Sequence, residues 1–314
     1  MIVMRAVWLR EFGGPEVLVA GEAPDPVPGT GQVLVGVAFA NTTFVETQFR
    51  AGLPGPFRAE LPVIPGNGVG GVVLSGPSEL VGAPVVTSLN GSGGYAERVV
   101  VDAAAPFRVP DGLALDDAVA LLADGRTATA LVRAAGVSAG ERVLVEAAAG
   151  GVGSLLVQLA RNAGATVIAA AGGARKTAVA RDLGADEVVD YTEPDWTARV
   201  DGPVDVVFDG VGGALGAAAF GLLRRGGRHF SYGLASGSWT EVPEEEAAAR
   251  GVTLHRGPLG SPADLRAATE WVLAEAAEGR VKPLVGQRFP LAQAAEAHRA
   301  IESRATIGKT LLEI

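Results

Sequence analysis

A glycine-rich turn that joins an apolar strand to an apolar helix carries the clearest chemistry in the sequence. Residues 142–154 read RVLVEAAAGGVGS, which matches the dinucleotide pattern G-x-G-x-x-G as Ala148-x-Gly150-x-x-Gly153, with alanine in the first position. In such turns a glycine lets backbone amides approach a pyrophosphate, the last glycine packs the helix on the strand, and the helix N-terminus adds partial positive charge. We therefore expect a dinucleotide to bind at Gly150, Gly151, Val152 and Gly153.

The end of the next strand distinguishes NAD from NADP. An NAD site carries an Asp or Glu about 20 residues after the turn, where it bonds the ribose 2′-hydroxyl. Residues 169–176 read AAAGGARK, without a carboxylate, and Glu146 lies too early in the chain for this role. Arg175 and Lys176 would attract a 2′-phosphate, and one charge-assisted contact is worth about 1.5–3 kcal/mol, or roughly 10–150-fold in affinity. The sequence predicts NADP(H), bound at Gly172, Arg175 and Lys176.

The composition argues against several other classes of protein. The 314 residues include no Cys and three His, namely His229, His255 and His298, so disulfides, thiol nucleophiles and Cys-ligated zinc are excluded. The formal net charge of −9 disfavours a nucleic-acid partner. The sequence contains no run of about 18 consecutive apolar residues, so no membrane-spanning helix is predicted. The strand-like residues 1–10, with Arg5 among them, lack the features of a signal peptide, and we expect a soluble, cytoplasmic protein.

Strands and helices alternate through the middle of the chain. Strands are expected at residues 142–148, 166–171, 187–191, 204–211, 227–233 and 252–256. Helices are expected at residues 152–163, 174–183 and 214–223, each followed by a glycine that can end it. Apolar strands that alternate with helices indicate a parallel sheet covered on both faces. The predicted fold class is therefore α/β, with a doubly wound parallel sheet.

The two ends of the chain have a different pattern of residues from the middle. Residues 1–120 hold short Val-rich runs between Pro- and Gly-rich turns, which is typical of an all-β module. Helices are expected at residues 113–135 and from Ser261, a predicted N-cap, to about residue 277. Residues 281–314 are again predicted to form strands and short helices, and we expect them to rejoin the first module. We place the domains at residues 1–122 and 123–284, with 285–314 returning to the first.

Several motifs spread over nearly the whole chain occur together in one known family. They are FGGPEVL at 12–18, AAAGGVG at 147–153, LGAD at 183–186 with VDY at 189–191, VDVVFDGVG at 204–212 and ESRAT at 302–306. In this combination the chain resembles the zinc-independent, zeta-crystallin-like quinone oxidoreductases of the medium-chain dehydrogenase/reductase superfamily. The resemblance implies a GroES-like β domain, a Rossmann domain, NADPH in the cleft between them, and a homodimer. Where zinc-dependent relatives carry a Gly-His-Glu run, residues 65–71 read PGNGVGG, so no metal is expected.

The resemblance also implies roles for individual residues. The positions that match the family's cofactor contacts are Thr127, Lys176, Tyr191, Val211, Tyr232, Gly233 and Arg304. Lys176 and Tyr191 would hold the adenosine phosphate end of the cofactor, and Thr127 would approach its nicotinamide end. The family often has an Asn and a Tyr that face the nicotinamide and the substrate. Thr43 and Gln48 stand in their places here, which keeps hydrogen-bonding capacity but alters the pocket.

These features predict an enzyme, an NADPH:quinone oxidoreductase. The cofactor would supply a hydride to an electron-poor acceptor, while the protein would orient the reactants and exclude water. The candidate catalytic residues are Thr43, Gln48 and Thr127, with Arg126 as a further hydrogen-bond donor. Two alternatives stay open: an NADPH-dependent reductase of enoyl or enone C=C bonds, and a non-catalytic NADPH-binding protein. The expected partner is a small-molecule quinone or enone.

Three remaining polar residues carry structural expectations. His229 is expected to pack within the fifth strand of the sheet, and His298 to lie solvated on a C-terminal helix. Asp209 ends the fourth strand, where it would either cap the next helix or approach the cofactor, and its residue type favours capping.

Overall fold

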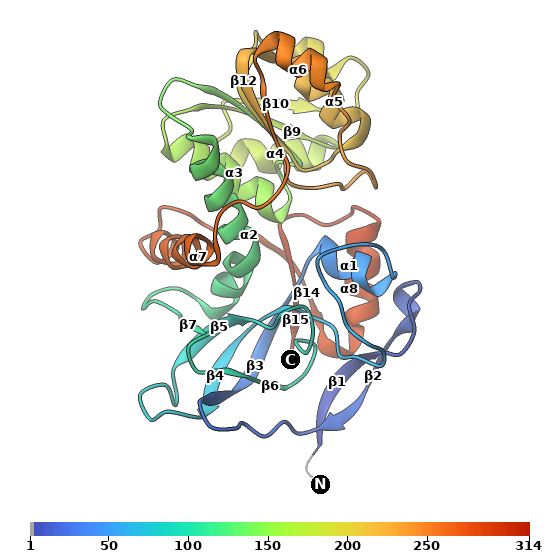
Figure 1. Cartoon of the computed structure of the whole chain (residues 1–314), viewed down its shortest axis with the longest axis vertical. Coiled ribbons are helices and arrows are strands. Elements are labelled where there is room, and N and C mark those ends of the chain that lie inside the picture. The colour runs from blue at the N-terminus through green and yellow to red at the C-terminus, as the bar shows by residue number, and fades with distance from the viewer. Residues whose placement is uncertain (1–2) are drawn as a thin grey trace. The chain divides into compact units, whose positions relative to one another are not determined.

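The computed structural model describes residues 3–314, which form two compact units (Figure 1). The discontinuous unit consists of Met1–Ala123 and Leu273–Ile314, and the central unit of Asp124–Val272. The strand expected at residues 1–10 is β1 (Val3–Leu9), and its first two expected positions lie outside the described residues. Within residues 3–314, no helix combines the length and the apolar character needed to cross a membrane.

The central unit is built on a six-stranded sheet in which all neighbouring strands are parallel. In spatial order the strands are β10 (Glu187–Asp190), β9 (Thr166–Ala171), β8 (Arg142–Glu146), β11 (Val204–Asp209), β12 (Leu223–Ser231) and β13 (Thr253–His255). The expected strands are confirmed, although β12 begins earlier than expected because Leu223 pairs with Val204 ahead of a register shift. The strand order reverses between β8 and β11, and open α/β sheets bind ligands outside the carboxyl ends of strands at such a switch point.

Helices connect these strands, and those expected at residues 152–163 and 174–183 end before a glycine, as predicted. Gly226, the glycine expected to end the helix at residues 214–223, instead lies within β12, which begins at Leu223. The helices are α3 (Gly151–Asn162), α4 (Ala174–Asp182), α5 (Gly213–Gly221), α6 (Glu244–Arg250) and the 3-10 helix η2 (Trp196–Arg199), while α2 (Leu115–Ala135) and α7 (Pro262–Ala277) each continue past a unit boundary. Gly164 and Gly184 follow α3 and α4 with φ values of 84° and 96°, the left-handed conformation in which glycine commonly ends helices. The Ser261 Oγ accepts a hydrogen bond from the Asp264 amide at 3.2 Å, so the predicted N-cap of α7 is confirmed.

The discontinuous unit contains a seven-stranded sheet and a separate antiparallel pair, β1 and β2 (Leu18–Pro24). The larger sheet has the order β14 (Val285–Pro290), β15 (Lys309–Glu313), β3 (Gln32–Thr42), β4 (Gly68–Ser75), β5 (Pro84–Ser88), β7 (Phe107–Arg108), with β6 (Arg98–Asp102) also paired to β3. β15 runs antiparallel to β3, with Thr310 opposite Thr42. The C-terminal tail therefore rejoins the first module, as predicted.

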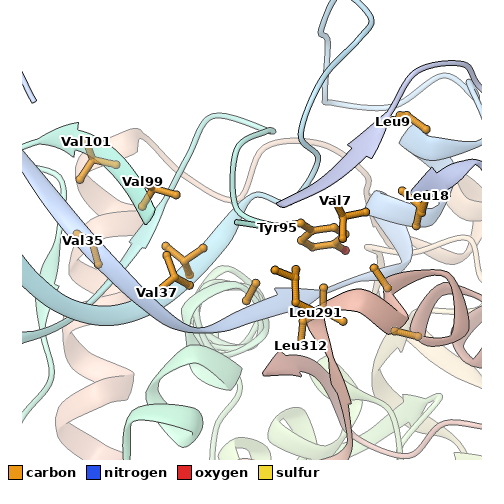
Figure 2. Close-up of a cluster of buried hydrophobic side chains, with 14 of the residues drawn as sticks. Val7, Leu9, Leu18, Val35, Val37, Tyr95, Val99, Val101, Leu291 and Leu312 are labelled. Atoms are coloured by element: carbon orange, nitrogen blue, oxygen red, sulfur yellow. The ribbon is translucent and has the colours of Figure 1, made fainter. Parts of the chain in front are cut away.

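Alternating valines of β3 point into the hydrophobic core of the discontinuous unit. Val35 and Val37 are buried between partly exposed neighbours, the period-2 pattern of a strand covered on one face. Figure 2 shows them in one cluster with Val7 of β1 and Leu312 of β15. The helices of this unit are α1 (Phe44–Arg50), α8 (Ala294–Glu302), and the 3-10 helices η1 (Pro15–Val17) and η3 (Leu291–Gln293). Phe49 of α1 packs into this core, which fixes the helix that carries the predicted site residue Gln48.

Candidate active site

The glycine turn opens α3 directly after β8. Ala147 takes a left-handed φ of 48°, and Gly150 is the N-cap of α3. Because Gly150 has no side chain, no cap at that position competes with a ligand for the amides of the first helical turn. A Cβ on Gly153 would lie 2.2 Å from the Ala147 carbonyl oxygen. The helix therefore packs on the turn as closely as the sequence pattern predicts.

Helix α2 places a carboxylate against this turn. A Cβ on Gly151 would lie 2.0 Å from Asp124 Oδ2, so the buried Asp124 side chain occupies the space that a larger residue would need. Thr127 and Arg126 follow on α2, and burial lowers the pKa of the Arg126 guanidinium while Asp124 opposes the shift. Thr127 and Arg126 were predicted near the site and Asp124 was missed. Its position directly after the apolar run 118–123 is the sequence signal that indicates a buried acid.

The start of α4 gathers residues predicted to hold the adenosine phosphate. Gly173 is its N-cap with a φ of 84°, and Arg175 and Lys176 lie in the first turn. The ring of Tyr191 lies beside Gly172, where an added Cβ would be 3.0 Å from Tyr191 Cε2. All of these residues follow the carboxyl ends of β9 and β10, which are neighbours in the sheet. The structure thus brings this predicted group together.

The same strand ends carry a carboxylate that sequence reasoning missed. Asp190, the last residue of β10, accepts hydrogen bonds at Oδ1 from the amides of Gly173 and Thr192, each at 2.9 Å, and from the Thr192 hydroxyl at 2.7 Å. Donation from Gly173, and then from Thr192, lowers the pKa of Asp190. The dinucleotide pattern points to an acid at the end of the second strand, whereas Asp190 ends the third strand, β10. Its Oδ1 fixes the backbone at the start of α4.

A second loop, residues 209–213, joins β11 to α5 at the switch point. Asp209 is fully buried, and its Oδ1 accepts hydrogen bonds from the Val211 amide at 3.1 Å and the Gly212 amide at 2.7 Å. Gly212 is the N-cap residue of α5. Asp209 therefore binds the amides of the loop that leads into α5 and not those of its first turn, so the capping role favoured from the sequence is wrong: Gly212 is the N-cap, and no side chain among the described residues caps the helix.

The other oxygen of Asp209 is held as firmly. Its Oδ2 accepts hydrogen bonds from Ser231 Oγ at 3.0 Å and from Thr240 Oγ1 at 2.5 Å. Burial alone would favour the neutral acid, but donation from Glu146, Thr240 and the loop amide outweighs it and lowers the pKa of Asp209. The carboxyl group is therefore an anion that organises the loop around it.

Tyr232 and Gly233 follow β12 and lie against this loop. A Cβ on Gly210 would be 2.5 Å from the Tyr232 hydroxyl, and a Cβ on Gly233 would be 2.6 Å from the Gly210 carbonyl oxygen. Burial, and then the charges of Glu146 and Asp209, raise the pKa of Tyr232 well above its ordinary value. Tyr232 is therefore a neutral hydroxyl over the working pH range, and its contact with a cofactor stays a prediction.

Gln48 lies on α1 and Thr43 directly precedes that helix, both in the discontinuous unit, whereas Thr127 lies in the central unit. The Thr43 amide donates to Glu46 Oε2 at 2.7 Å, and the Thr43 hydroxyl donates to the same oxygen. Glu46 is buried and also accepts a bond from the Asn67 amide at 3.2 Å, and burial raises its pKa despite these donors. Thr43 therefore serves as the N-cap of α1. Arg304 belongs to the same unit and follows α8 with a φ of 57°.

The variant Thr43→Ala is expected to lower the free energy of unfolding by about 0.5–2 kcal/mol, because it removes the N-cap side chain of α1. Thr43→Ser keeps the hydroxyl and should match the wild type. Urea denaturation of both variants measures the difference. Equal stability of Thr43→Ala and the wild type would contradict the capping role.

His298 is buried, and the expectation of a solvated side chain is wrong. It is 0% exposed, and its Nε2 lies 2.9 Å from the Tyr95 hydroxyl. Burial, and then the positive charge of the buried Arg50, lower the pKa of His298 to about 3. His229 is packed, as predicted, and burial lowers its pKa as well.

Acid is therefore expected to destabilise the protein through His298. Its folded pKa of about 3 lies below the ordinary value of 6.5, so the folded state binds fewer protons than the unfolded state between these limits. The stabilising contribution is complete above pH 6.5 and is lost as the pH falls toward 3, by up to about 1.4 kcal/mol per pH unit. Urea unfolding at several pH values between about 6.5 and 5 gives the free energy of unfolding as a function of pH. This free energy should fall less steeply with decreasing pH in His298→Gln than in the wild type. An unchanged slope would refute this assignment.

Known relatives match nearly the whole chain, and a family model matches its C-terminal part. A family model described as zinc-binding dehydrogenase matches residues 183–312. The chain is 32% identical to a 2-haloacrylate reductase from a Burkholderia species, covering 99% of both chains. It is 32% identical to the quinone oxidoreductase of Pseudomonas aeruginosa, covering 98% of this chain and 99% of that one. The structure of Escherichia coli quinone oxidoreductase complexed with NADPH matches with a TM-score of 0.89 and 30% identity, covering 99% of this chain and 100% of that chain.

The fold and these relatives define an oxidoreductase of the medium-chain dehydrogenase/reductase superfamily, with a GroES-like β domain and a Rossmann domain. Within that superfamily, the chain belongs to the zeta-crystallin-like quinone oxidoreductase family, as its motifs predict.

The description of the matching family model names zinc, but the residues of this chain do not fit a zinc ion. The sequence has no Cys. Residues 3–314 contain no group of three or more His, Cys, Asp or Glu side chains that could hold a metal ion. Structural zinc sites take four nitrogen, sulfur or oxygen ligands and catalytic sites three. We therefore assign no residue of this chain to a metal.

Proposed function

We propose that the chain is an NADPH-dependent reductase that delivers a hydride to a quinone or a similar electron-poor carbonyl acceptor. The start of α3 carries the proposal, because it presents uncapped amides at the switch point of the sheet. Arg175 and Lys176 open α4 after the neighbouring strand and complement a 2′-phosphate. The NADPH complex of the Escherichia coli relative supports the same cofactor.

The residues of the central unit fit this cofactor. The close approach of Gly153 to the Ala147 backbone leaves no room for a side chain at position 153, so the start of α3 can lie close to the turn that would hold a pyrophosphate. When bound, NADPH supplies a hydride from its nicotinamide. The chain itself would hold and orient the cofactor. The proposed contacts at its phosphate and adenosine end are Gly150, Gly151, Val152, Gly153, Gly172, Arg175, Lys176 and Tyr191, and those toward its nicotinamide end are Thr127, Val211, Tyr232 and Gly233.

The acceptor needs a hydrogen-bond donor and one proton. A quinone that takes a hydride becomes an anion, which a neutral donor stabilises until water protonates it. Because the Thr43 hydroxyl donates to Glu46, we propose Gln48 and Thr127 as the principal donors and Thr43 as the residue that positions α1.

Reduction of an activated C=C bond is a second candidate function. The similarity to a 2-haloacrylate reductase over nearly the full length of both chains favours it. In that reaction the hydride would go to one carbon of the double bond and a proton to the other, so the site would require a proton donor.

The loss of NADPH absorbance with purified protein tests these proposals. An ortho-quinone and an α,β-unsaturated ketone are offered in parallel, with NADH and protein-free controls. Faster loss with the quinone supports the first function, and loss only with the ketone supports the second. NADPH binding without consumption by either acceptor would indicate a binding protein, and no binding of NADPH would contradict the proposal.

We further propose, from the family resemblance, that the chain works as a cytoplasmic homodimer and that Arg304 contacts the cofactor. The proposed functional domains are residues 1–122 and 123–284, with 285–314 returning to the first. Size-exclusion chromatography with light scattering tests the dimer, and a monomer mass would contradict it.

A further inference from the structure

Two carboxyl groups meet at the switch point of the central sheet. Glu146 ends β8 and Asp209 ends β11, and these strands are parallel neighbours. Both side chains are 0% exposed. The Val211 amide lies between them, with its nitrogen 3.3 Å from Glu146 Oε2 and 3.1 Å from Asp209 Oδ1. Two carboxyl groups this close in a buried site do not both ionise, so one of them holds a proton.

The surrounding donors decide which group holds that proton. Asp209 accepts bonds from two loop amides and two hydroxyl groups, as described above. Glu146 shares only the Val211 amide, and its Oε1 has no hydrogen-bond partner among residues 3–314. Donors stabilise the ionised form of a carboxyl group, so Asp209 carries the charge and Glu146 the proton. Burial, and then the charge of Asp209, accordingly raise the pKa of Glu146 well above 4.5.

We propose that Glu146 is a positioning residue that acts as a neutral carboxylic acid, donating its proton to Asp209 and so holding the 209–213 loop in place for the cofactor. This inference rests on the function proposed above. Gly212 and Gly213 have φ values of 76° and 56° and contribute no side chains that could anchor the loop themselves. The loop therefore depends on Asp209, and a proton on Glu146 would add a further donor to the four that already hold this carboxylate.

No neighbouring group compensates a second negative charge in this place. His229 faces Asp209, with its Nε2 3.9 Å from Oδ2, and burial lowers its pKa, which keeps it neutral. Tyr232 faces the pair from the segment after β12 as a neutral hydroxyl. Asp124 of α2 and Tyr191 after β10 face Tyr232 in turn and add no positive charge. Of the described groups that shift the pKa of Glu146, none is a cation.

The proton on Glu146 makes the fold and cofactor binding sensitive to pH. Because its folded pKa lies above the ordinary 4.5, the folded protein binds more protons than the unfolded chain between these two values. The contribution to stability is complete below pH 4.5 and is lost as the pH rises through the folded pKa. Ionisation also adds negative charge behind an anionic cofactor. We therefore expect the dissociation constant for NADPH to rise with pH, by up to about 10-fold per pH unit above that pKa.

The variant Glu146→Gln tests the proposal, because it keeps the size and a donor but cannot ionise. Glu245→Gln removes the same type of group from the exposed first turn of α6 and is the matched control. Infrared spectra of the cofactor-free proteins report the carbonyl band of a protonated carboxylic acid. Fluorescence titrations from about pH 6 to about pH 9 give the dissociation constant for NADPH.

The wild type minus Glu146→Gln infrared difference should contain the protonated-acid band at neutral pH, and the wild type minus Glu245→Gln difference should lack it. Over the pH range in which the acid band disappears, the NADPH dissociation constant should rise in the wild type and stay flat in Glu146→Gln. The absence of the acid band at neutral pH, or loss of the band with no accompanying rise in the dissociation constant, would overturn the inference. If Glu146→Gln does not fold, Asp209→Asn replaces it, and the acid band should then titrate at a lower pH than in the wild type. Failure of the wild type to bind NADPH at any pH refutes the proposed function alone, since the infrared result still decides the state of Glu146.

Discussion

Replacing Arg175 and Lys176 together with alanine is expected to raise the dissociation constant for NADPH by at least about 100-fold while leaving that for NADH nearly unchanged. Each charge-assisted contact with a 2′-phosphate contributes about 1.5–3 kcal/mol, or roughly 10–150-fold in affinity. The ionised Asp190 stays at the same strand ends in the variant, so its repulsion of the phosphate is then unopposed. Fluorescence titration with both dinucleotides measures the effect.

Arg181→Ala provides the matched control for this pair. Arg181 lies in the last turn of α4, so the substitution removes an equal charge from the same helix at its opposite end. It should bind both dinucleotides as the wild type does. Unchanged NADPH binding in the double variant would contradict the phosphate site, and an equal loss of NADPH and NADH would indicate that the turn itself had unfolded.

Gly153→Ala is expected to lower the free energy of unfolding by about 1–3 kcal/mol and to abolish tight NADPH binding. The added Cβ would lie 2.2 Å from the Ala147 carbonyl oxygen and 2.8 Å from its carbonyl carbon. Both are backbone atoms, so no side chain can rotate away to make room. Relief requires α3 to move from β8, which displaces the amides proposed to bind the pyrophosphate.

Gly221→Ala is the control for a glycine in a helix without this constraint. Its added Cβ has no atom within 4 Å, and it lies at the end of α5. We expect this variant to be as stable as the wild type or more stable by about 0.4–1 kcal/mol. Urea denaturation and NADPH titration of both variants provide the measurements. Wild-type stability and binding in Gly153→Ala would refute the packing argument.

The central sheet could be predicted from the sequence because its signals are local. Apolar runs of strand length, together with Gly164 and Gly184 after α3 and α4, indicate the strand and helix positions without knowledge of their partners. The glycine turn at 147–153 is likewise a short continuous segment. The sequence also suffices to predict the capping role of Thr43, since Thr43 and Glu46 have the spacing of a capping box.

Pairs of residues distant in sequence could not be predicted in this way. His298 is buried because it meets Tyr95, 203 residues away. Asp190 reaches the start of α4 only because β10 lies beside β9. Glu146 is an isolated acid in an apolar strand until the order of the sheet places Asp209 next to it. In each case the surroundings of the side chain are set by strand pairing or by tertiary packing, which short sequence patterns do not contain.

The ratio of kcat/KM for NADPH to kcat/KM for NADH, measured on the wild-type protein with a single ortho-quinone, tests the central claim most directly. The proposed 2′-phosphate contacts of Arg175 and Lys176 predict a ratio of at least about 10. A ratio near 1, or a clear preference for NADH, would contradict an NADPH-dependent reductase built on these residues.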